Sequence, residues 1–414
     1  MDVRQILGAI LTFSMFVMLG NMIKKEHFDE YVLMDVQVPT HVEHNFTLMM
    51  QHSLIHLPSQ TIKNHGQRLK LCWNNSSPTK ASVPSKGLVM FSLTDGPEYH
   101  VSQVANAVSV AKHLGATLVL PEIIGSKGEK RAFDEIYDVN KFVRSMNGVI
   151  QVEARKQPET STQKFIDVKV PYNADQNYIM NNIKPVFQTA RNVRVISYLP
   201  SSNMRQGDVD KSMNQYSCWA AFEALRLKPE LQEAVDSVVT KLRSHDKNGQ
   251  FVAIDYKSEM MRSSICQSMA YKGIKTCYNP IEIARFFQRI GYPRDSILYV
   301  TQSKADHSLR ALKDLYPNTL TKEDIMHEAK MTKYVDSKTS ELEQAIIDFQ
   351  VCSVSEVFVP AKSGLFYANV AGNRIANSRP DILVPAQITS NVAQDHVSSY
   401  IAKASHPVYA CFCK

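Results

Sequence analysis

The chain has 414 residues, a formal net charge of +7 and a sequence pI of about 8.9. This length allows two domains, each with its own core. The positive charge suits an anionic substrate or a membrane surface. No block rich in Lys and Arg with interleaved aromatic residues is present, which argues against a nucleic-acid partner.

The first predicted element is an uncharged apolar run at residues 6–23. At 1.5 Å per residue a helix of this length reaches about 27 Å, enough for a thin bilayer such as that of the endoplasmic reticulum or Golgi. A cleaved signal peptide is the alternative, but its apolar core is usually shorter and is followed by a cleavage site with small residues. No such site is present here. We therefore predict a transmembrane signal anchor preceded by a short cytoplasmic tail at residues 1–5.

The stretch after the anchor predicts a lumenal stem. Residues 24–84 are rich in His, Asn, Gln, Ser and Pro and show no sustained period. Asn45, Asn74 and Asn75 each begin an N-x-S/T sequon, which makes them candidate glycosylation sites and favours a lumenal body.

The seven cysteines suggest disulfides and give little support for a metal site. An odd number leaves at least one cysteine free or bonded to another chain. Cys266 and Cys277 bracket a short polar stretch, so we predict a disulfide between them. Cys411-Phe-Cys413 has no His or Cys pair near it in the sequence, whereas structural zinc needs four ligands; we predict no metal site.

From residue 85 strands and helices alternate. The apolar run 88–93 predicts a buried strand, Pro97 begins a helix with apolar positions at helical spacing, and Gly115 ends it as a left-handed cap. Residues 117–120 predict the next, parallel strand, and 149–152 and 193–199 predict further strands of the same sheet.

The second half repeats this pattern. Helices are predicted over 229–243, from 280 to Gly291, over 309–315, over 341–349 and over 363–371 with Gly372 as cap, and strands over 251–255, 297–300 and 357–360. The fold class is therefore α/β, with two doubly wound Rossmann-like domains. The polar stretch 201–208 breaks the pattern, and we place the domains at 85–210 and 211–414.

Ligands of open parallel sheets bind beyond the carboxyl ends of the strands. Two strand-to-helix turns there could hold a phosphate. The first contains Asp95 and Gly96, and the second is 360–364, with Ser363 able to cap the helix or donate to a phosphate. Neither turn matches a dinucleotide or P-loop pattern, and ordinary turn chemistry is the alternative.

Two further patterns are weaker. Asp208-Val-Asp210 resembles the D-x-D by which many glycosyltransferases hold a metal and a diphosphate, but it lies in a polar loop and not directly after a strand. His100, near the start of the first helix, either faces the ligand site or is an ordinary solvated residue.

Longer segments resemble plant O-fucosyltransferase-like proteins, and the mannan-synthesis-related branch most closely. The segments that carry the resemblance are 85–100, 111–122 and 355–369, and it extends from the anchor to the last residues. It implies a GT-B-like fold with two domains facing across a cleft, a type II anchor in the Golgi membrane and a nucleotide-sugar donor, often GDP-linked. It also implies inversion at the anomeric carbon without a metal or other cofactor.

The resemblance also implies site residues. Family members have Gly-Gly-x-Asn-Gln after the first strand, where this chain has Asp95, Gly96, Pro97 and Glu98, and an arginine that binds the diphosphate, where this chain has Lys257. A lysine keeps the charge but not the bidentate fork. The expected donor-binding residues are Gly96, Asp255, Lys257, Glu356, Ser363 and Gly364, with Asp95, Glu98 and His100 as candidate bases.

These observations predict a Golgi glycosyltransferase that acts in mannan biosynthesis for the plant cell wall. Its partners would be a nucleotide sugar and a polysaccharide acceptor, with a mannan synthase as a further candidate. The alternative is a catalytically inactive accessory protein of a mannan synthase complex, because the family asparagine and arginine are missing.

Overall fold

The computed structural model describes residues 70–71, 84–94, 96–125, 128–153, 164–172, 174–198, 215–262, 266, 277–303, 306–328, 334, 341–385 and 396–413. The predicted anchor, the three sequons, Asp95 and the Asp208-Val-Asp210 motif lie outside these residues. Within them, no helix has both the length and the apolar character needed to cross a bilayer. Contacts divide the chain into residues 1–60 and 61–414, and all of the described residues belong to the second unit.

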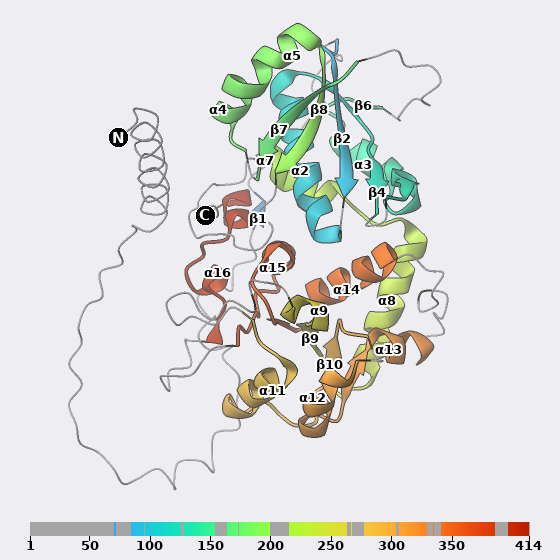
Figure 1. The fold of residues 1–414 in the computed structure, drawn as a ribbon, viewed down its shortest axis with the longest axis vertical. Coiled ribbons are helices and arrows are strands. Elements are labelled where there is room, and N and C mark those ends of the chain that lie inside the picture. Colours follow the sequence, from blue (N-terminus) through green and yellow to red (C-terminus); the bar gives the residue numbers. More distant parts are fainter. Residues whose placement is uncertain are drawn as a thin grey trace, which may run out of the picture. The chain divides into compact units, whose positions relative to one another are not determined.

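The first lobe, residues 84–227, is built on a largely parallel sheet (Figure 1). Strand β2 is central and pairs in parallel with β3, β4 and β8. Strand β7 continues the sheet beyond β8, β6 pairs with β3, and β5 pairs antiparallel with β4. The strands are β2 (Leu88–Thr94), β3 (Thr117–Val119), β4 (Glu122–Ile124), β5 (Lys130–Ala132), β6 (Val152–Glu153), β7 (Ile166–Pro171) and β8 (Asn192–Tyr198).

Helix α2 (Pro97–Leu114) is buried on nearly every side. It contacts β2 and β8 of the sheet, and α7 packs along it. Pro97 begins it and Gly115 ends it with φ 65° and ψ 38°, as predicted from the sequence. The other helices of this lobe are α3 (Val139–Met146), α4 (Gln176–Tyr178), α5 (Lys184–Ala190) and α7 (Gln215–Trp219).

The second lobe, residues 228–385, contains a four-stranded parallel sheet in the order β11-β10-β9-β12. Helix α14 contacts β9, α8 and α15. The strands are β9 (Val252–Asp255), β10 (Leu298–Val300), β11 (Thr319–Thr321) and β12 (Val357–Pro360). The helices are α8 (Pro229–Ser244), α9 (Ser258–Met261), α11 (Pro280–Arg289), α12 (Arg310–Leu315), α13 (Lys322–Glu328), α14 (Glu341–Val354) and α15 (Leu365–Ala376).

Two boundaries, that between the domains and that of the stem, differ between the prediction and the structure. Helix α7, just after the predicted boundary at 210, packs on α2 of the first lobe, so the second lobe begins with α8. Strand β1 (Lys70–Leu71), inside the predicted stem, pairs antiparallel with β13 (Phe412–Cys413) at the end of the chain. Strands β4, β5, β7 and β11 and helices α3, α4, α5, α7, α9 and α13 were not predicted; none is longer than eight residues, so each gives only a short sequence pattern.

Gly372 was predicted to end a helix, and this is wrong. Helix α15 continues through it to Ala376. A Cβ at Gly372 would lie 2.8 Å from Cε1 of His406, a buried residue of the C-terminal segment. The glycine therefore permits close packing and does not cap the helix.

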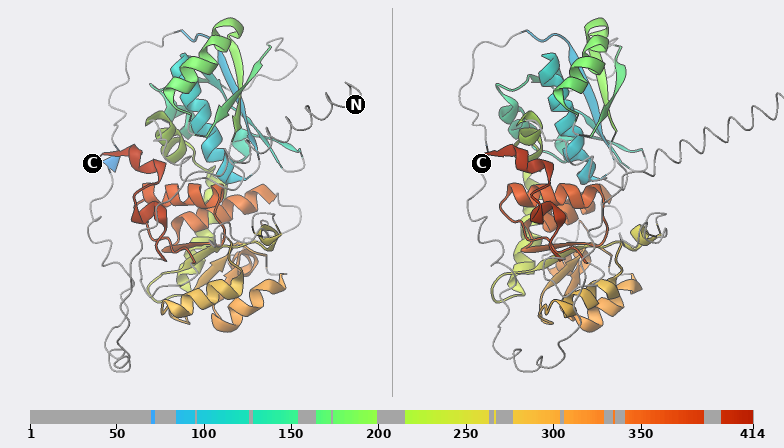
Figure 2. Two further views of the ribbon diagram at one scale, coloured as in Figure 1. Left: turned by 60° about the vertical axis from the view of Figure 1, so that its left-hand side comes forward. Right: turned by 90° about the vertical axis from the view of Figure 1, so that its left-hand side faces the viewer.

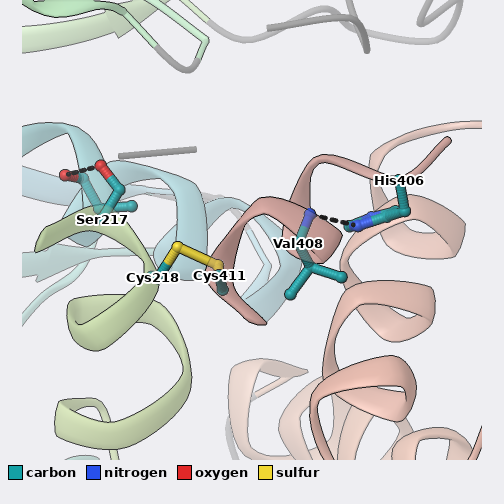
Figure 3. The surroundings of a disulfide bond; sticks show 6 residues. Ser217, Cys218, His406, Val408 and Cys411 are labelled. Carbon is teal, nitrogen blue, oxygen red and sulfur yellow. Dashed lines mark hydrogen bonds between the residues drawn. A yellow bond between two sulfur atoms is a disulfide. The ribbon is translucent and has the colours of Figure 1, made fainter. Parts of the chain in front are cut away.

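The C-terminal segment, residues 396–413, joins the two lobes. The His406 ring donates from Nε2 to the Ala368 carbonyl of α15 and accepts at Nδ1 from the Val408 N–H. Cys411 then forms a disulfide with Cys218 of α7 (Figure 3). This bond was not predicted, whereas the predicted Cys266–Cys277 disulfide is confirmed. Among the described cysteines, only Cys352 is free, and it is buried.

The Cys218–Cys411 disulfide closes a loop of 193 residues, whereas Cys266–Cys277 closes one of 11. Because the entropic effect of a disulfide grows with loop length, removing the first bond with Cys218→Ala and Cys411→Ala should lower the free energy of unfolding by about 2–5 kcal/mol. Chemical denaturation of the non-reduced proteins measures the loss. The matched double variant at Cys266 and Cys277 should lose less, and a larger loss there would contradict the chain-entropy argument.

Candidate active site

The candidate site lies at the carboxyl ends of the second lobe's parallel strands. The chain forms β9, then β10 and β11 on one side of it, and finally β12 on its other side. The direction of winding therefore reverses between β9 and β12. Ligands of open α/β sheets bind at such switch points, and Asp255, Lys257, Ser363 and Gly364 all lie in or directly after these two strands.

The turn after β9 is fixed by the turn after β10. The Thr301 hydroxyl donates to the Tyr256 carbonyl and accepts from the Tyr256 N–H, at 3.0 and 3.1 Å. The Gln302 side chain accepts from the Ser258 N–H. The Ala361 N–H after β12 donates to the Asp255 carbonyl at 3.1 Å. These bonds hold Lys257 in a defined backbone position between the two neighbouring strands.

Asp255 is buried at the end of β9, with 1% of its surface exposed. The Thr301 hydroxyl lies 3.3 Å from Oδ1, and Oδ2 has no hydrogen-bond partner among the described residues. Burial raises the pKa of Asp255 to about 7; the Lys257 ammonium opposes this rise, while the charges of Glu98 and Asp348 add to it. Asp255 is therefore a carboxyl group that changes protonation near neutral pH.

Lys257 is the partly exposed cation of the site. Its side chain is 33% exposed, and its Nζ lies 3.7 Å from Oδ2 of Asp348, a residue of α14. Burial opposes the charged form, but the carboxylates of Asp348, Asp255 and Glu98 outweigh it and raise the pKa of Lys257. The lysine therefore stays protonated at neutral pH and is available to an anion.

Gly364 is the residue directly before α15, and it has φ 151° and ψ −170°, a conformation that favours glycine. No described side chain caps this helix, so Ser363 does not have the predicted capping role. Ser363 is exposed, and its hydroxyl is compatible with the predicted contact to a phosphate. Uncapped N–H groups at the start of a 12-residue helix attract anions.

The start of α2 meets α15 in this region. The Asn369 amide donates to the Glu98 carbonyl and to the Ser102 hydroxyl. In both views of Figure 2 one end of the cyan helix α2 lies against the orange and red helices α14 and α15, in agreement with their contacts. The first lobe thus contributes Glu98 to the electrostatics of the site in the second lobe.

Gly96 does not fit a phosphate cradle. It precedes α2 in an extended conformation, and a Cβ placed on it would overlap the Glu98 carboxylate. That carboxylate therefore lies against Gly96 and brings negative charge to the start of the helix, where a phosphate would bind. Glu98 itself is half-buried and is the one candidate base that the structure describes near the site.

His100 is not a suitable base. It is fully buried, its Nδ1 lies 2.7 Å from the Tyr137 hydroxyl, and its Nε2 has no partner among the described residues. Burial lowers the pKa of His100 to about 3. The imidazole is neutral at physiological pH and out of reach of an acceptor. The prediction erred because a single residue near a helix start gives no signal of which way it faces.

Glu356 is at the wrong end of its strand to bind the donor. It precedes β12, whereas Ser363 and Gly364 follow it. Its carboxylate accepts from the Phe251 N–H and forms ion pairs with Arg243 and Arg379, at 2.9 and 3.4 Å. Four residues of strand separate it from the carboxyl edge, about 13 Å at 3.3 Å per residue. Glu356 is a structural residue of the amino edge.

Sequence reasoning missed the partners of Lys257. Asp348 is 0% exposed and is contacted by Tyr299 and Lys322 as well as by Lys257. The one available signal was an acidic residue inside the apolar run 345–349 of a predicted helix. Within the described residues, no group of three or more His, Cys, Asp or Glu is placed to hold a metal ion.

The chain is similar to a family model, to curated proteins and to solved structures. A family model described as GDP-fucose protein O-fucosyltransferase matches residues 100–377. Protein MANNAN SYNTHESIS-RELATED 2 of Arabidopsis thaliana is 43% identical over 423 residues, covering 100% of this chain and 99% of that protein. Protein MANNAN SYNTHESIS-RELATED of Trigonella foenum-graecum is 43% identical over 422 residues, with the same coverage. The crystal structure of POFUT1 in its apo form is 13% identical, with a TM-score of 0.48, and covers 75% of this chain and 100% of that one.

The raised pKa of Asp255 predicts how stability depends on pH. Unfolded Asp255 loses its proton near pH 4 and the folded residue near pH 7, so the folded chain binds more protons in between. The stability contributed by this group is complete below about pH 4 and is lost as the pH rises through 7. Asp255→Asn should remove this loss, which is on the order of a few kcal/mol.

Denaturation at several pH values between 4 and 8 checks this. The matched control is Asp236→Asn on the exposed side of α8, which should keep the wild-type slope. If the free energy of unfolding changed with pH equally in Asp255→Asn and in the wild type, burial would not raise the pKa of Asp255.

Proposed function

The chain belongs to the GDP-fucose protein O-fucosyltransferase family, and from this premise we propose that it transfers a sugar from a nucleotide-sugar donor. The family resemblance seen in the sequence is thereby confirmed. The finer proposal is a Golgi glycosyltransferase of mannan biosynthesis that uses a GDP-linked donor and a polysaccharide acceptor. The relatives named mannan synthesis-related support the role in mannan biosynthesis, and the description of the family model supports a GDP-linked donor.

The observation that carries the proposal is the position of Lys257. A protonated, partly exposed lysine lies at the β9–β12 switch point, and the uncapped start of α15 follows β12 directly. A departing nucleoside diphosphate develops negative charge, which a cation and helix N–H groups stabilise. We propose that Lys257, Gly364 and Ser363 bind the diphosphate. Asp255 borders this site as a carboxyl group that is neutral below about pH 7.

The proposed reaction inverts the anomeric carbon and needs no metal. A carboxylate takes the proton of the acceptor hydroxyl while the acceptor oxygen bonds to the anomeric carbon and the bond from that carbon to the diphosphate breaks. Glu98 is our candidate for this base because it lies at the start of α2, next to α15. The remaining proposals are a GT-B-like arrangement of the two lobes, a type II anchor at residues 6–23 with the body in the lumen, and a mannan synthase as a partner.

Donor binding tests the proposal. Full-length protein in detergent should bind GDP, GDP-mannose or GDP-fucose in calorimetry. Lys257→Met should weaken that binding by about tenfold or more, because a charge-assisted contact to the diphosphate is lost. Glu356→Gln is the matched control: it removes a charge from the opposite edge of the same sheet and should leave donor affinity unchanged.

Absence of binding of all three nucleotides at millimolar concentration would contradict the proposal. A cellular test separates it from the alternative of an inactive accessory protein, which family membership does not favour. If Lys257→Ala restored mannan to cells that lack the protein, the role of Lys257 in transfer would be rejected.

A further inference from the structure

Asp348 is a fully buried carboxylate in the middle of α14. Both of its oxygens have partners from the neighbouring sheet. The Tyr299 hydroxyl of β10 donates to Oδ1 at 2.7 Å, and the Lys322 ammonium, directly after β11, donates to Oδ2 at 3.0 Å. Lys257, after β9, forms an ion pair with the same Oδ2 at 3.7 Å. Residues within or just after three strands of the sheet, β9, β10 and β11, therefore contact this one carboxylate.

The two ammonium groups differ in accessibility. The Lys322 side chain is 11% exposed, whereas that of Lys257 is 33% exposed. Lys322 is thus the inner partner that neutralises Asp348, and Lys257 is the outer one that can reach a ligand. Asp348, Lys322 and Lys257 form a triad. Because two ammonium groups share one carboxylate, this triad has a surplus of positive charge. Asp255 and Glu98 also face Lys257, and Asp255 is only partly ionised near pH 7.

A lysine ammonium is harder to orient than a guanidinium. It is a point charge at the end of a flexible four-carbon stem, and much rotamer freedom is lost when it is held in one place. A fixed carboxylate within ion-pair distance reduces this freedom before a ligand arrives. Asp348 is such a carboxylate, because Tyr299 and Lys322 hold its own two oxygens.

We infer that Asp348 is a positioning residue that holds the Lys257 ammonium at the β9–β12 switch point, ready for a diphosphate. The inference rests on the proposed function for the nature of the ligand. Asp348 does not touch the donor in this proposal; it acts through Lys257 alone. Lys322 and Tyr299 have the supporting role of fixing the carboxylate.

A double-mutant cycle tests whether Asp348 acts through Lys257. Full-length wild type, Asp348→Asn, Lys257→Met and the double variant are titrated with GDP. Each single variant should bind about tenfold more weakly, and the double variant no more weakly than Lys257→Met. Asparagine keeps the shape of the side chain and an acceptor for Lys322. If Asp348→Asn does not fold, Tyr299→Phe replaces it in the cycle and should weaken GDP binding to a smaller extent.

A second measurement does not depend on the ligand. NMR of reductively ¹³C-methylated protein follows the ionisation of Lys257, whose resonance is assigned from its loss in Lys257→Met. Asp348→Asn should lower the pKa of Lys257, because one of the carboxylates that raise it is gone. The Glu356→Gln control should leave this pKa unchanged.

Three outcomes would each overturn the inference. Asp348→Asn could bind GDP as tightly as the wild type, it could weaken GDP binding equally in the presence and absence of Lys257, or it could leave the pKa of Lys257 unchanged. Failure of the wild type to bind GDP would instead overturn the proposed function. The NMR titration would still show in that case whether Asp348 holds the Lys257 ammonium.

Discussion

A carboxylate removed from water must be paired, and this constraint organises the second lobe. Asp348 lies on the buried face of α14, where an unpaired charge would cost several kcal/mol. Of its three partners, Tyr299 lies within β10, and Lys257 and Lys322 lie just after β9 and β11. The pairing therefore fixes α14 against the carboxyl edge of the sheet. The same edge, and not the amino edge where Glu356 lies, carries the candidate site.

Elements distant in the chain complete this edge. Helix α15 begins there, and its Asn369 bonds to the start of α2 in the first lobe. Helix α15 also holds the C-terminal segment through His406, and that segment carries the disulfide with α7. One helix thus receives contacts from the first lobe, from the last residues of the chain and from the sheet. Its uncapped start is held in a rigid frame, as a preorganised anion site requires.

Local signals in the sequence were enough to predict the longest helices and the central strand of each lobe. These signals act over only a few residues. Examples are the proline that begins α2, the glycine that follows it, and the capping box that Asn279 and Glu282 form at the start of α11. The candidate site was only partly predictable, because its pairings are not local. Lys322 lies 26 residues from Asp348, and nothing near either residue indicates the other. The prediction for His100 was wrong for a related reason, because whether a helical residue faces the core or a ligand depends on what packs against the helix.

In the proposed donor site, Lys257 stands where the sequence resemblance implies an arginine, and its surroundings give this difference a physical explanation. An arginine brings its own geometry, since its planar fork can grip two oxygens at once. A lysine depends on its surroundings for orientation, and here a buried carboxylate supplies it from α14. Lys322 prevents that carboxylate from cancelling the charge of Lys257, because it takes the shorter of the two bonds to the shared oxygen. Under the proposed function, a site with a lysine in place of the fork can therefore hold a directed positive charge, provided that Asp348, Lys322 and Lys257 are all present.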